Sequence, residues 1–122
     1  MLEINSVSNT IYLTKGDTGI ITITLNGVPN NYTNLHLHFY VRNSNNLDNV
    51  KIHISDDQSV QSEGEPQGRI ENSGNTWTVY IYSAATESLK RQKYVYDLKL
   101  TANNVVTTFI GGEKTKTEFW VT

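Results

Sequence analysis

Apolar side chains recur at every second position along most of this chain, and this period constrains the fold more than any other feature. In the segment 35–41, Leu35, Leu37, Phe39 and Val41 alternate with polar or amphipathic residues. Successive side chains of a strand point to opposite faces, so this period predicts a strand with one buried and one exposed face. Similar alternation occupies the segments 11–13, 21–25, 50–54, 77–81, 94–100 and 119–121.

Short clusters of turn-forming residues separate the alternating segments. Asn26-Gly27 and Gly111-Gly112 are examples, and each favours a break between antiparallel strands. About seven to nine short strands separated in this way indicate an all-β chain, folded as a β-sandwich or a small barrel. The 122 residues suit a single domain, 1–122, with one hydrophobic core and no internal repeat.

Two segments do not follow the strand pattern. Residues 55–68 are polar and contain glycine and proline, which predicts a long exposed loop. Residues 83–90 are expected to form a short helical turn, with Ser83 as its N-cap and Leu89 directed toward the core. The carboxylates of the loop segment lack the spacing of a calcium loop and are expected to be solvated. They are Asp56, Asp57, Glu63 and Glu65.

Charge and composition narrow the possible function classes. Ten basic and twelve acidic residues give a formal net charge of -2, which argues against a nucleic-acid-binding surface. The chain contains no cysteine, which excludes disulfides, thiol nucleophiles and cysteine-based zinc sites. No apolar stretch is long enough to span a membrane, and the N-terminus lacks the pattern of a signal peptide. We therefore expect synthesis in a cytoplasm and no membrane partner.

The triplet Asp17-Thr18-Gly19 looks like the catalytic motif of a retroviral-type aspartic protease. Such an enzyme needs two carboxylates that share one proton, one from each protomer. Here Lys15 and Gly16 separate Asp17 from the preceding strand, and an adjacent lysine favours an ionised carboxylate. We interpret the segment instead as a turn in which Gly16 takes a special backbone angle and Asp17 bonds to local backbone. The protease is kept as a remote alternative.

Three histidines lie on neighbouring predicted strands. His36 and His38 share one strand face, and a pairing of Val41 with Val50 would place His53 opposite His38. A slip of two residues would instead move His53 towards His36 or Tyr40. Three imidazoles can hold zinc or nickel, but no carboxylate that would orient them is evident nearby. We interpret the group as a solvated sheet face or a pairing surface for another subunit, and we expect no metal and no other cofactor. A partner covering this face would make its binding sensitive to pH.

Several aromatic residues are expected on the outward faces of strands. Exposed tyrosine and tryptophan supply contact area at low entropy cost, which is typical of protein interfaces and sugar-binding faces. Ordinary β-propensity produces the same pattern. Together with the histidines, the candidate interaction residues are Tyr12, His36, His38, Tyr40, His53, Tyr80, Tyr82 and Trp120.

The segment Ile11–Gly27 resembles the first strands of a group of phage and prophage virion domains. In that group a strand ends in Leu-Thr, is followed by Lys/Arg-Gly-Asp-Thr and leads into an alternating apolar strand, as Leu13–Thr18 does here. The segments 35–43, 83–101 and 114–122 resemble later strands of the same domains. The matching residues there are Phe39, Val41, Arg42, Leu89, Tyr94, Tyr96, Asp97, Leu98, Leu100, Phe119 and Val121. The best-known member of the group is the N-terminal domain of phage baseplate upper proteins.

This resemblance implies an immunoglobulin-like antiparallel β-sandwich of about seven to nine strands with one short helical turn. It carries no catalytic residues. It implies a non-enzymatic structural component of the virion, of the tail or baseplate type, which docks onto other virion proteins or onto further copies of itself. A glycan-binding or adhesion module that uses exposed tyrosines and Trp120 is the alternative.

The same fold gives a role to two further tyrosines. In immunoglobulin-like sandwiches, a tyrosine two positions before a core residue fixes the corner that leads into its strand. Tyr94 is therefore expected to fix such a corner, with Tyr96 filling the core position.

Overall fold

The chain forms ten strands and one short helix within the part that the structure describes. This computed structural model describes residues 2–5, 10–24, 34–56, 67–102, 105–110 and 117–122. The elements are β1 (Leu2–Asn5), β2 (Thr10–Leu13), β3 (Gly19–Thr24), β4 (Leu35–Asn43), β5 (Asn46–Ser55), β6 (Gly68–Ser73), β7 (Thr76–Ile81), α1 (Ser83–Glu87), β8 (Lys93–Ala102), β9 (Val105–Ile110) and β10 (Thr117–Val121). Across these ranges, no helix has the length and apolar character needed to cross a membrane.

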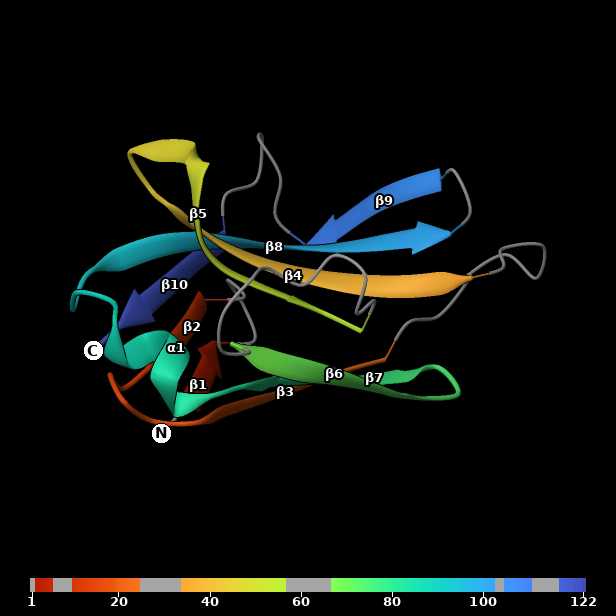
Figure 1. The fold of residues 1–122 in the computed structure, drawn as a ribbon, viewed down its shortest axis with the longest axis horizontal. Helices are drawn as coiled ribbons and strands as arrows, with labels where there is room; N and C mark the ends of the chain where they lie inside the picture. Colours follow the sequence, from red (N-terminus) through yellow and green to blue (C-terminus); the bar gives the residue numbers. More distant parts are fainter. Residues whose placement is uncertain (1, 6–9, 25–33, 57–66, 103–104, 111–116) are drawn as a thin grey trace.

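The strands form two sheets that pack face to face (Figure 1). The large sheet has the order β1-β2-β10-β8-β4-β5, and β9 also pairs with β8. The small sheet has the order β3-β7-β6. The small sheet corresponds to strands B, E and D of an immunoglobulin domain, and β10, β8, β4 and β5 correspond to G, F, C and C′. The expected all-β, immunoglobulin-like sandwich is therefore confirmed.

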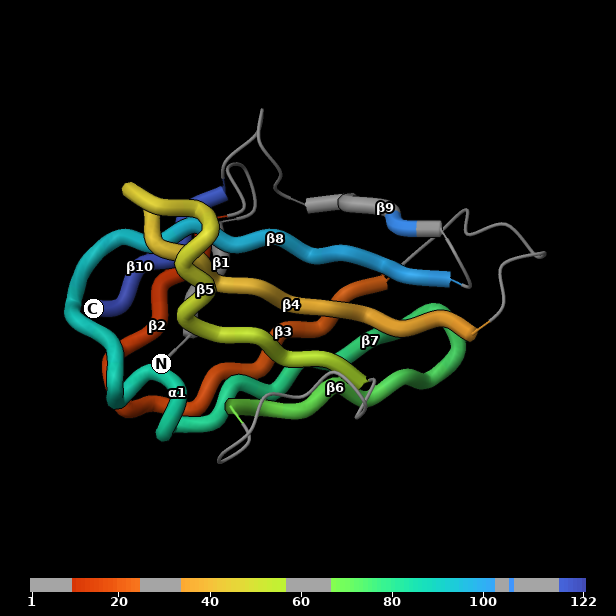
Figure 2. The backbone as a smooth tube through the Cα atoms, turned by 45° about the horizontal axis from the view of Figure 1, so that its top comes forward, coloured from red at the N-terminus to blue at the C-terminus, as the bar shows by residue number. Residues whose placement is uncertain are grey.

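Most strand pairs are antiparallel, and the exception links the first and last parts of the chain. β10 runs parallel to β2, with Phe119 opposite Ile11 and Val121 opposite Leu13. β10 and β9 pair with successive parts of β8, since Thr117 lies opposite Tyr96 whereas β9 pairs from Leu98 onward. Figure 2 shows β8 running beside β4 along most of its length. β8 therefore pairs with three strands of the large sheet, which are β4, β9 and β10.

The strand β6 was not expected from the sequence. Its residues, GRIENS, include Ile70 as the single large apolar side chain, so alternation does not mark it. The predicted loop 55–68 is too long for the same reason, because Ser55 ends β5 and Gly68 begins β6, and both are buried. A Cβ atom at Gly68 would meet the carbonyl oxygen of Tyr80. Glycine here permits close strand packing instead of marking a loop.

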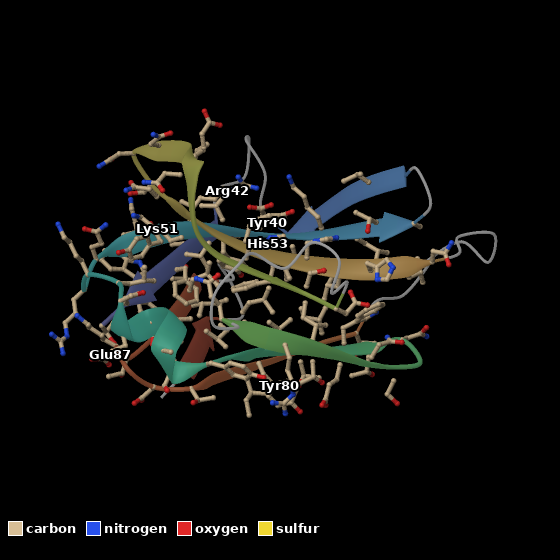
Figure 3. All side chains as sticks on the ribbon, viewed as in Figure 1. Tyr40, Arg42, Lys51, His53, Tyr80 and Glu87 are labelled. Atoms are coloured by element: carbon tan, nitrogen blue, oxygen red, sulfur yellow. The ribbon has the colours of Figure 1, made fainter. Side chains whose placement is uncertain are left out.

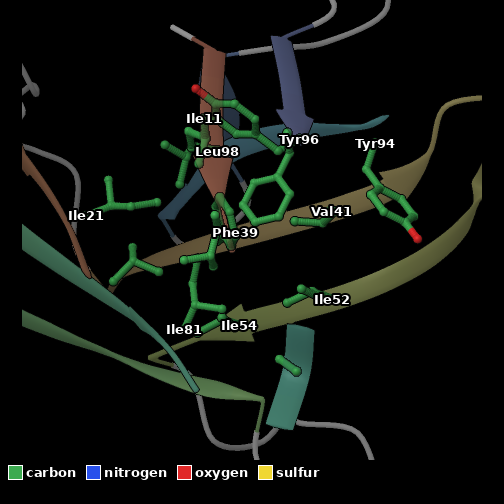
Figure 4. Close-up of a cluster of buried hydrophobic side chains, with 14 of the residues drawn as sticks. Ile11, Ile21, Phe39, Val41, Ile52, Ile54, Ile81, Tyr94, Tyr96 and Leu98 are labelled. Atoms are coloured by element: carbon green, nitrogen blue, oxygen red, sulfur yellow. The ribbon is translucent and has the colours of Figure 1, made fainter. Parts of the chain in front are cut away.

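The two sheets enclose one hydrophobic core (Figure 4). The inward-facing positions of the strands supply it, as the alternation predicts. Phe39 is fully buried, and its ring centroid lies 5.8 Å from that of Tyr96 and 6.3 Å from that of Phe119. Truncating a buried aromatic of this kind to alanine costs about 3–5 kcal/mol. This aromatic contact joins β4, β8 and β10 on the inner side of the large sheet.

The expected helical turn is present as α1, which carries the chain from β7 in the small sheet to β8 in the large sheet. The predicted capping role of Ser83 is wrong, because Tyr82 is the N-cap and no side chain caps the helix. The backbone turns one residue earlier than expected, since the Ala85 N–H donates to the Tyr82 carbonyl oxygen at 3.0 Å. Leu89 follows the helix and is buried, as expected.

Tyr94 fixes the corner between α1 and β8, as expected. Its hydroxyl lies 3.2 Å from both the backbone nitrogen and the carbonyl oxygen of Lys90, so it accepts one hydrogen bond and donates another. The Tyr94 side chain is almost fully buried, and Tyr96 occupies the core two residues later. Burial raises the pKa of Tyr96 to about 12. This is the geometry of the tyrosine corner of immunoglobulin-like domains.

Candidate functional site

The outer face of the large sheet carries a cluster of aromatic and charged side chains. We call this the outer-face cluster. It consists of His38, Tyr40 and Arg42 from β4, His53 from β5, and Asp97 and Lys99 from β8. In β4 the residues between these positions, Phe39 and Val41 among them, point into the core, so the period of two directs the cluster outward. Figure 3 shows Tyr40, Arg42 and His53 on the side of the large sheet that faces away from the small sheet.

The register of β4 and β5 is slipped by two residues from the pairing of Val41 with Val50. Val41 lies opposite Ile52 instead of Val50, and His53 lies opposite Tyr40 instead of His38. The cause is two register shifts, one on each side of Arg42, which leave extra residues of β5 unpaired between Asn46 and Ile52. A local bulge of this kind leaves no mark on the apolar period.

The two histidines nevertheless meet diagonally across the strands. The Nδ1 atom of His38 lies 3.1 Å from the Nε2 atom of His53, and the two ring centroids are 5.4 Å apart. The ring of Tyr40 stacks on His53 with a centroid distance of 4.3 Å and an interplanar angle of 9°. The three rings therefore form one continuous stack.

Two cations contact the ring of Tyr40. The guanidinium carbon of Arg42 lies 4.6 Å from the ring centroid, and the Nζ atom of Lys99 lies 5.5 Å from it. Both distances fall within the range of favourable cation–π interactions. The same ring thus contacts two imidazoles and two positive charges, which hold its orientation.

Asp97 is the carboxylate that lies close to both cations. Its side chain is only 8% exposed, and its Oδ1 atom accepts a hydrogen bond from the Nε atom of Arg42 at 3.0 Å. Its Oδ2 atom is buried without a hydrogen-bond partner in the part of the chain described, and Lys99 Nζ lies 3.7 Å away. Arg42 also donates from Nη1 to the Leu47 carbonyl oxygen at 3.1 Å. A buried carboxylate requires such partners, so Arg42 is held rigidly over the face.

The cluster shifts two pKa values in ways that keep both groups uncharged near neutral pH. Burial is the main cause that raises the pKa of Tyr40; Arg42 opposes the shift and Asp97 adds to it. Burial also lowers the pKa of His53, and the neighbouring His38 and Arg42 lower it further. The Tyr40 hydroxyl therefore stays protonated, and His53 stays neutral and able to accept or donate one hydrogen bond.

His36 lies beside the stack without joining it. Its Nδ1 atom is 3.2 Å from Oδ2 of Asp56, whose Oδ1 accepts a hydrogen bond from the Leu37 N–H at 2.7 Å. The expectation that no carboxylate lies near the histidines is therefore wrong, because the end of β5 brings Asp56 back beside β4. Asp56 is fixed to the sheet instead of being solvated. Asp57, Glu63 and Glu65 lie outside the described residues.

The histidines do not converge on one point. Among the residues that the structure describes, no group of three or more His, Asp or Glu side chains is arranged to hold a metal ion. His38 is 6% exposed, so it is more buried than the outward position in the sequence suggests. Its ring is covered by the neighbouring rings of Tyr40 and His53.

Tyr80 lies on the small sheet, on the opposite side of the molecule from Tyr40 (Figure 3), and Tyr82 follows the end of β7. The guanidinium carbon of Arg69 lies 4.0 Å from the Tyr80 ring centroid, and Nη1 of Arg69 lies 3.4 Å from the Tyr82 hydroxyl. The Tyr80 hydroxyl also donates to Glu71 at 3.2 Å. These two tyrosines form a second surface, separate from the outer-face cluster.

Tyr12 and Trp120 form a third location among the eight candidates. They are direct partners in the parallel register of β2 and β10. Tyr12 is 37% exposed and Trp120 is half-buried. Sequence reasoning placed these residues on outward faces, but it did not group the eight candidates into three separate surfaces.

Asp17 lies in the turn between β2 and β3, as the structural interpretation expected. Its N–H donates to the Thr14 carbonyl oxygen at 2.9 Å, and Gly16 has a φ of 85°, which favours glycine. The Oγ1 atom of Thr86 accepts a hydrogen bond from the Gly16 N–H at 3.1 Å and lies 3.3 Å from the Asp17 carbonyl oxygen. The turn is therefore fastened to α1, which is a structural role for this segment.

The outer edge of β5 is bonded to the side chain of Gln67, the residue that precedes β6. The Oε1 atom of Gln67 accepts a hydrogen bond from the His53 N–H at 3.0 Å, and its Nε2 atom donates to the Lys51 carbonyl oxygen at 2.9 Å. The backbone of Gln67 also accepts a hydrogen bond from the Tyr82 N–H at 2.9 Å. The primary amide thus pairs with a sheet edge as a neighbouring strand would.

Sequence reasoning missed the charged partners that organise the cluster. The sequence identified Arg42 and Asp97 only as residues that match the virion-domain pattern. It did not identify Lys99 or Gln67 as candidates. The sequence does contain one indication of such a partner. Asp97 is the single acidic residue in the largely apolar segment 94–100, and an aspartate in a strand buried on both sides needs a cation. Which strand would supply the cation depends on the sheet order.

No protein-family model matches this chain, and no curated protein is similar to it.

Proposed function

We propose that this chain is a non-enzymatic structural component of a phage or prophage particle, of the tail or baseplate type, which acts by protein–protein docking. The observation that supports docking most directly is the outer-face cluster. Tyrosine and arginine are enriched in the energetically important parts of interfaces. Here Arg42 is held by Asp97 and Tyr40 is held between a ring and two cations, so a partner would lose little side-chain entropy on binding.

The virion context of this proposal comes from the resemblance of the segments 11–27, 35–43, 83–101 and 114–122 to phage virion domains. Arg42 and Asp97 are both among the matching residues, and they form the central ion pair of the cluster. The residues that carry the family resemblance and the residues of the docking surface would then be the same. The partner would be another virion protein or a further copy of this chain.

The geometry favours docking through the sheet face over docking through the edge of β5. The N–H of His53 and the carbonyl oxygen of Lys51 already bond to Gln67. An added strand would have to displace that amide. The rings of Tyr40 and His53, in contrast, lie on the outer face beside this edge (Figure 3).

Cross-linking of purified particles tests the proposal. Lys99 belongs to the outer-face cluster and Lys51 lies two residues from His53, whereas Lys15 lies in the turn between β2 and β3. We expect the chain to be present in particles, with lysine cross-links from Lys51 and Lys99 to one virion protein and few from Lys15. Absence of the chain from particles purified from its own host would refute the proposed virion role.

A matched pair of variants then tests the surface. Tyr40→Ala is expected to weaken the partner's affinity by about thirty-fold, the effect of losing a hot spot worth about 2 kcal/mol. Tyr80→Ala removes a tyrosine with a comparable arginine contact on the opposite side of the molecule and should leave affinity unchanged. Equal losses in both variants, with both proteins folded, would contradict docking through the outer-face cluster.

A glycan-binding module is the second candidate, and the pairing of Tyr12 with Trp120 favours it. Adjacent aromatics on neighbouring strands offer a surface on which a sugar ring can pack. In the described residues neither ring has a stacking or cation contact of the kind found at Tyr40 and Tyr80. A glycan array with the original chain and Trp120→Ala tests this candidate; binding that requires Trp120 would favour it over docking.

A further inference from the structure

A polar cleft lies at one end of the sandwich, between the β4–β5 turn and the segment that joins α1 to β8. Its volume is about 330 Å³, at the lower end of the range for pockets that hold small ligands. The lining residues come from three places in the sequence that the fold brings together. They are Asn43, Asn45, Lys51, Ser88, Leu89, Lys90, Gln92 and Tyr94.

The cleft is positively charged without compensation. Lys51 and Lys90 line it, and none of the lining residues is acidic. Elsewhere the lysines of the large sheet are paired, Lys93 with Glu118 at 3.6 Å and Lys99 with Asp97 at 3.7 Å. No such ion pair is present for Lys51 or Lys90 within the described ranges. Two cations therefore face a shared cavity in a chain whose net charge is -2.

The walls of the cleft are fixed before any ligand binds. The Tyr94 hydroxyl holds the backbone of Lys90, and the Gln92 carbonyl oxygen accepts a hydrogen bond from the Val121 N–H at 3.0 Å. On the other wall, Oδ1 of Asn43 accepts the Asn45 N–H at 2.9 Å. This bond leaves the Nδ2 amino group of Asn43 as its remaining donor. Such walls offer hydrogen-bond donors without a large cost of ordering.

We infer that this cleft binds a small oxyanion of the phosphate class, held by the ammonium groups of Lys51 and Lys90 and by the side-chain amides around them. Lysine recognises phosphate as a point charge and does not need the fork geometry of arginine. Residues 90–93 form a basic run, KRQK. Its first residue, Lys90, lines the cleft, whereas Lys93 is already paired outside the cleft. This inference goes beyond docking, because the cleft is lined by residues that do not belong to the outer-face cluster.

Titration with inorganic phosphate tests the site. At about pH 7.5 a phosphate group is largely dianionic, and sodium chloride of matched ionic strength serves as the control. We expect saturable shifts of the backbone amide signals of Asn45, Lys90 and Gln92 in a heteronuclear NMR spectrum. Methyl phosphate as a second probe distinguishes the two sources of such a group: tighter binding than phosphate indicates an esterified phosphate, and equal binding indicates the free anion. Shifts that rise linearly and match those in chloride would overturn the inference.

Charge variants separate a built site from general attraction to a basic surface. Lys51→Gln combined with Lys90→Gln is expected to weaken phosphate binding by at least about ten-fold, since two charge-assisted hydrogen bonds are lost. Lys93→Gln removes one charge from the same basic run but outside the cleft. It should change phosphate binding by less than about two-fold, because Lys93 does not line the cleft and is paired with Glu118. Equal weakening by Lys93→Gln would show that net charge alone attracts phosphate. Both replaced lysines line the surface of the cleft, so we expect the variants to remain folded. Well-dispersed NMR spectra would confirm this.

Discussion

The Nδ1 atom of His38 lies 3.1 Å from the Nε2 atom of His53, and the two imidazole rings are joined by this contact on the outer face of the large sheet. Such a bond requires a proton on one nitrogen and a lone pair on the other. If both rings became imidazolium ions, the bond would be lost and two positive charges would face each other beside Arg42 and Lys99. The contact is therefore compatible with one added proton at most.

Protein stability should fall on mild acidification for this reason. Burial, His38 and Arg42 lower the pKa of His53 below its ordinary value of 6.5, so the unfolded chain binds a proton more readily than the folded one. Stability from this residue is thus fully present above about pH 6.5 and declines as the pH falls toward the folded-state pKa. Urea unfolding midpoints measured from neutral pH downward check this expectation.

His53→Gln provides the control for the pH effect. Glutamine keeps a polar group at this position but does not titrate. The decline in midpoint should become shallower in this variant, whereas His36→Gln, which removes a histidine outside the stack, should retain most of it. An unchanged pH profile in His53→Gln would contradict the assignment to His53.

Removal of the Tyr94 hydroxyl should destabilise the fold without changing its core. Tyr94→Phe keeps the buried ring but leaves the Lys90 N–H and carbonyl oxygen without their shared partner. We expect a loss of about 1–3 kcal/mol in the free energy of unfolding, the usual cost of unsatisfied polar groups. Tyr12→Phe removes a hydroxyl from an exposed ring and should have an effect within about 0.5 kcal/mol. Denaturant unfolding of both variants measures the difference.

The link between the Asp17 turn and α1 should be measurable through Thr86. Thr86 is fully buried, and its hydroxyl contacts Gly16 and Asp17 from 69–70 residues away in sequence. Thr86→Val preserves the shape but removes the acceptor for the Gly16 N–H, which should cost about 1–3 kcal/mol. Thr22→Val on the exposed face of β3 is the matched control, and a strand position of this kind should tolerate valine. Unfolding midpoints that decline equally in both variants would argue against a specific role for the Thr86 hydroxyl.

Gln67 should protect the edge of β5 from pairing with other chains. Gln67→Ala removes both side-chain bonds to the edge, so we expect faster hydrogen exchange at the His53 amide and greater self-association at high protein concentration. Gln67→Glu keeps an acceptor for the His53 N–H but loses the donor to Lys51, and its His53 amide should exchange at an intermediate rate. Size-exclusion chromatography and exchange-detected NMR provide the two readouts. Identical exchange in all three proteins would mean that the amide does not protect this edge.

The local pattern of the sequence determined which segments become strands and which of their faces point outward. The alternation assigned the even-numbered positions of 36–42 to the outer face, and likewise His53 in the segment 50–54. Tyr40 and His53 do lie on that face, because successive side chains of a strand must alternate. Tyr94 and Tyr96 were likewise placed correctly, since their roles follow from a short spacing within one strand.

Tertiary structure alone decided how these faces are combined. The register shifts on both sides of Arg42 set His53 opposite Tyr40, and the neighbouring position of β4 and β8 brought Arg42 to Asp97, 55 residues away. The side chain of Gln67 bonds to β5 from the position just before β6, a strand with too few apolar residues to be recognised from the sequence. Periodicity is a property of one strand, whereas register, bulges and ion pairs depend on which strands become neighbours. That choice is made by packing of the whole core, and the apolar period of a single segment does not contain it.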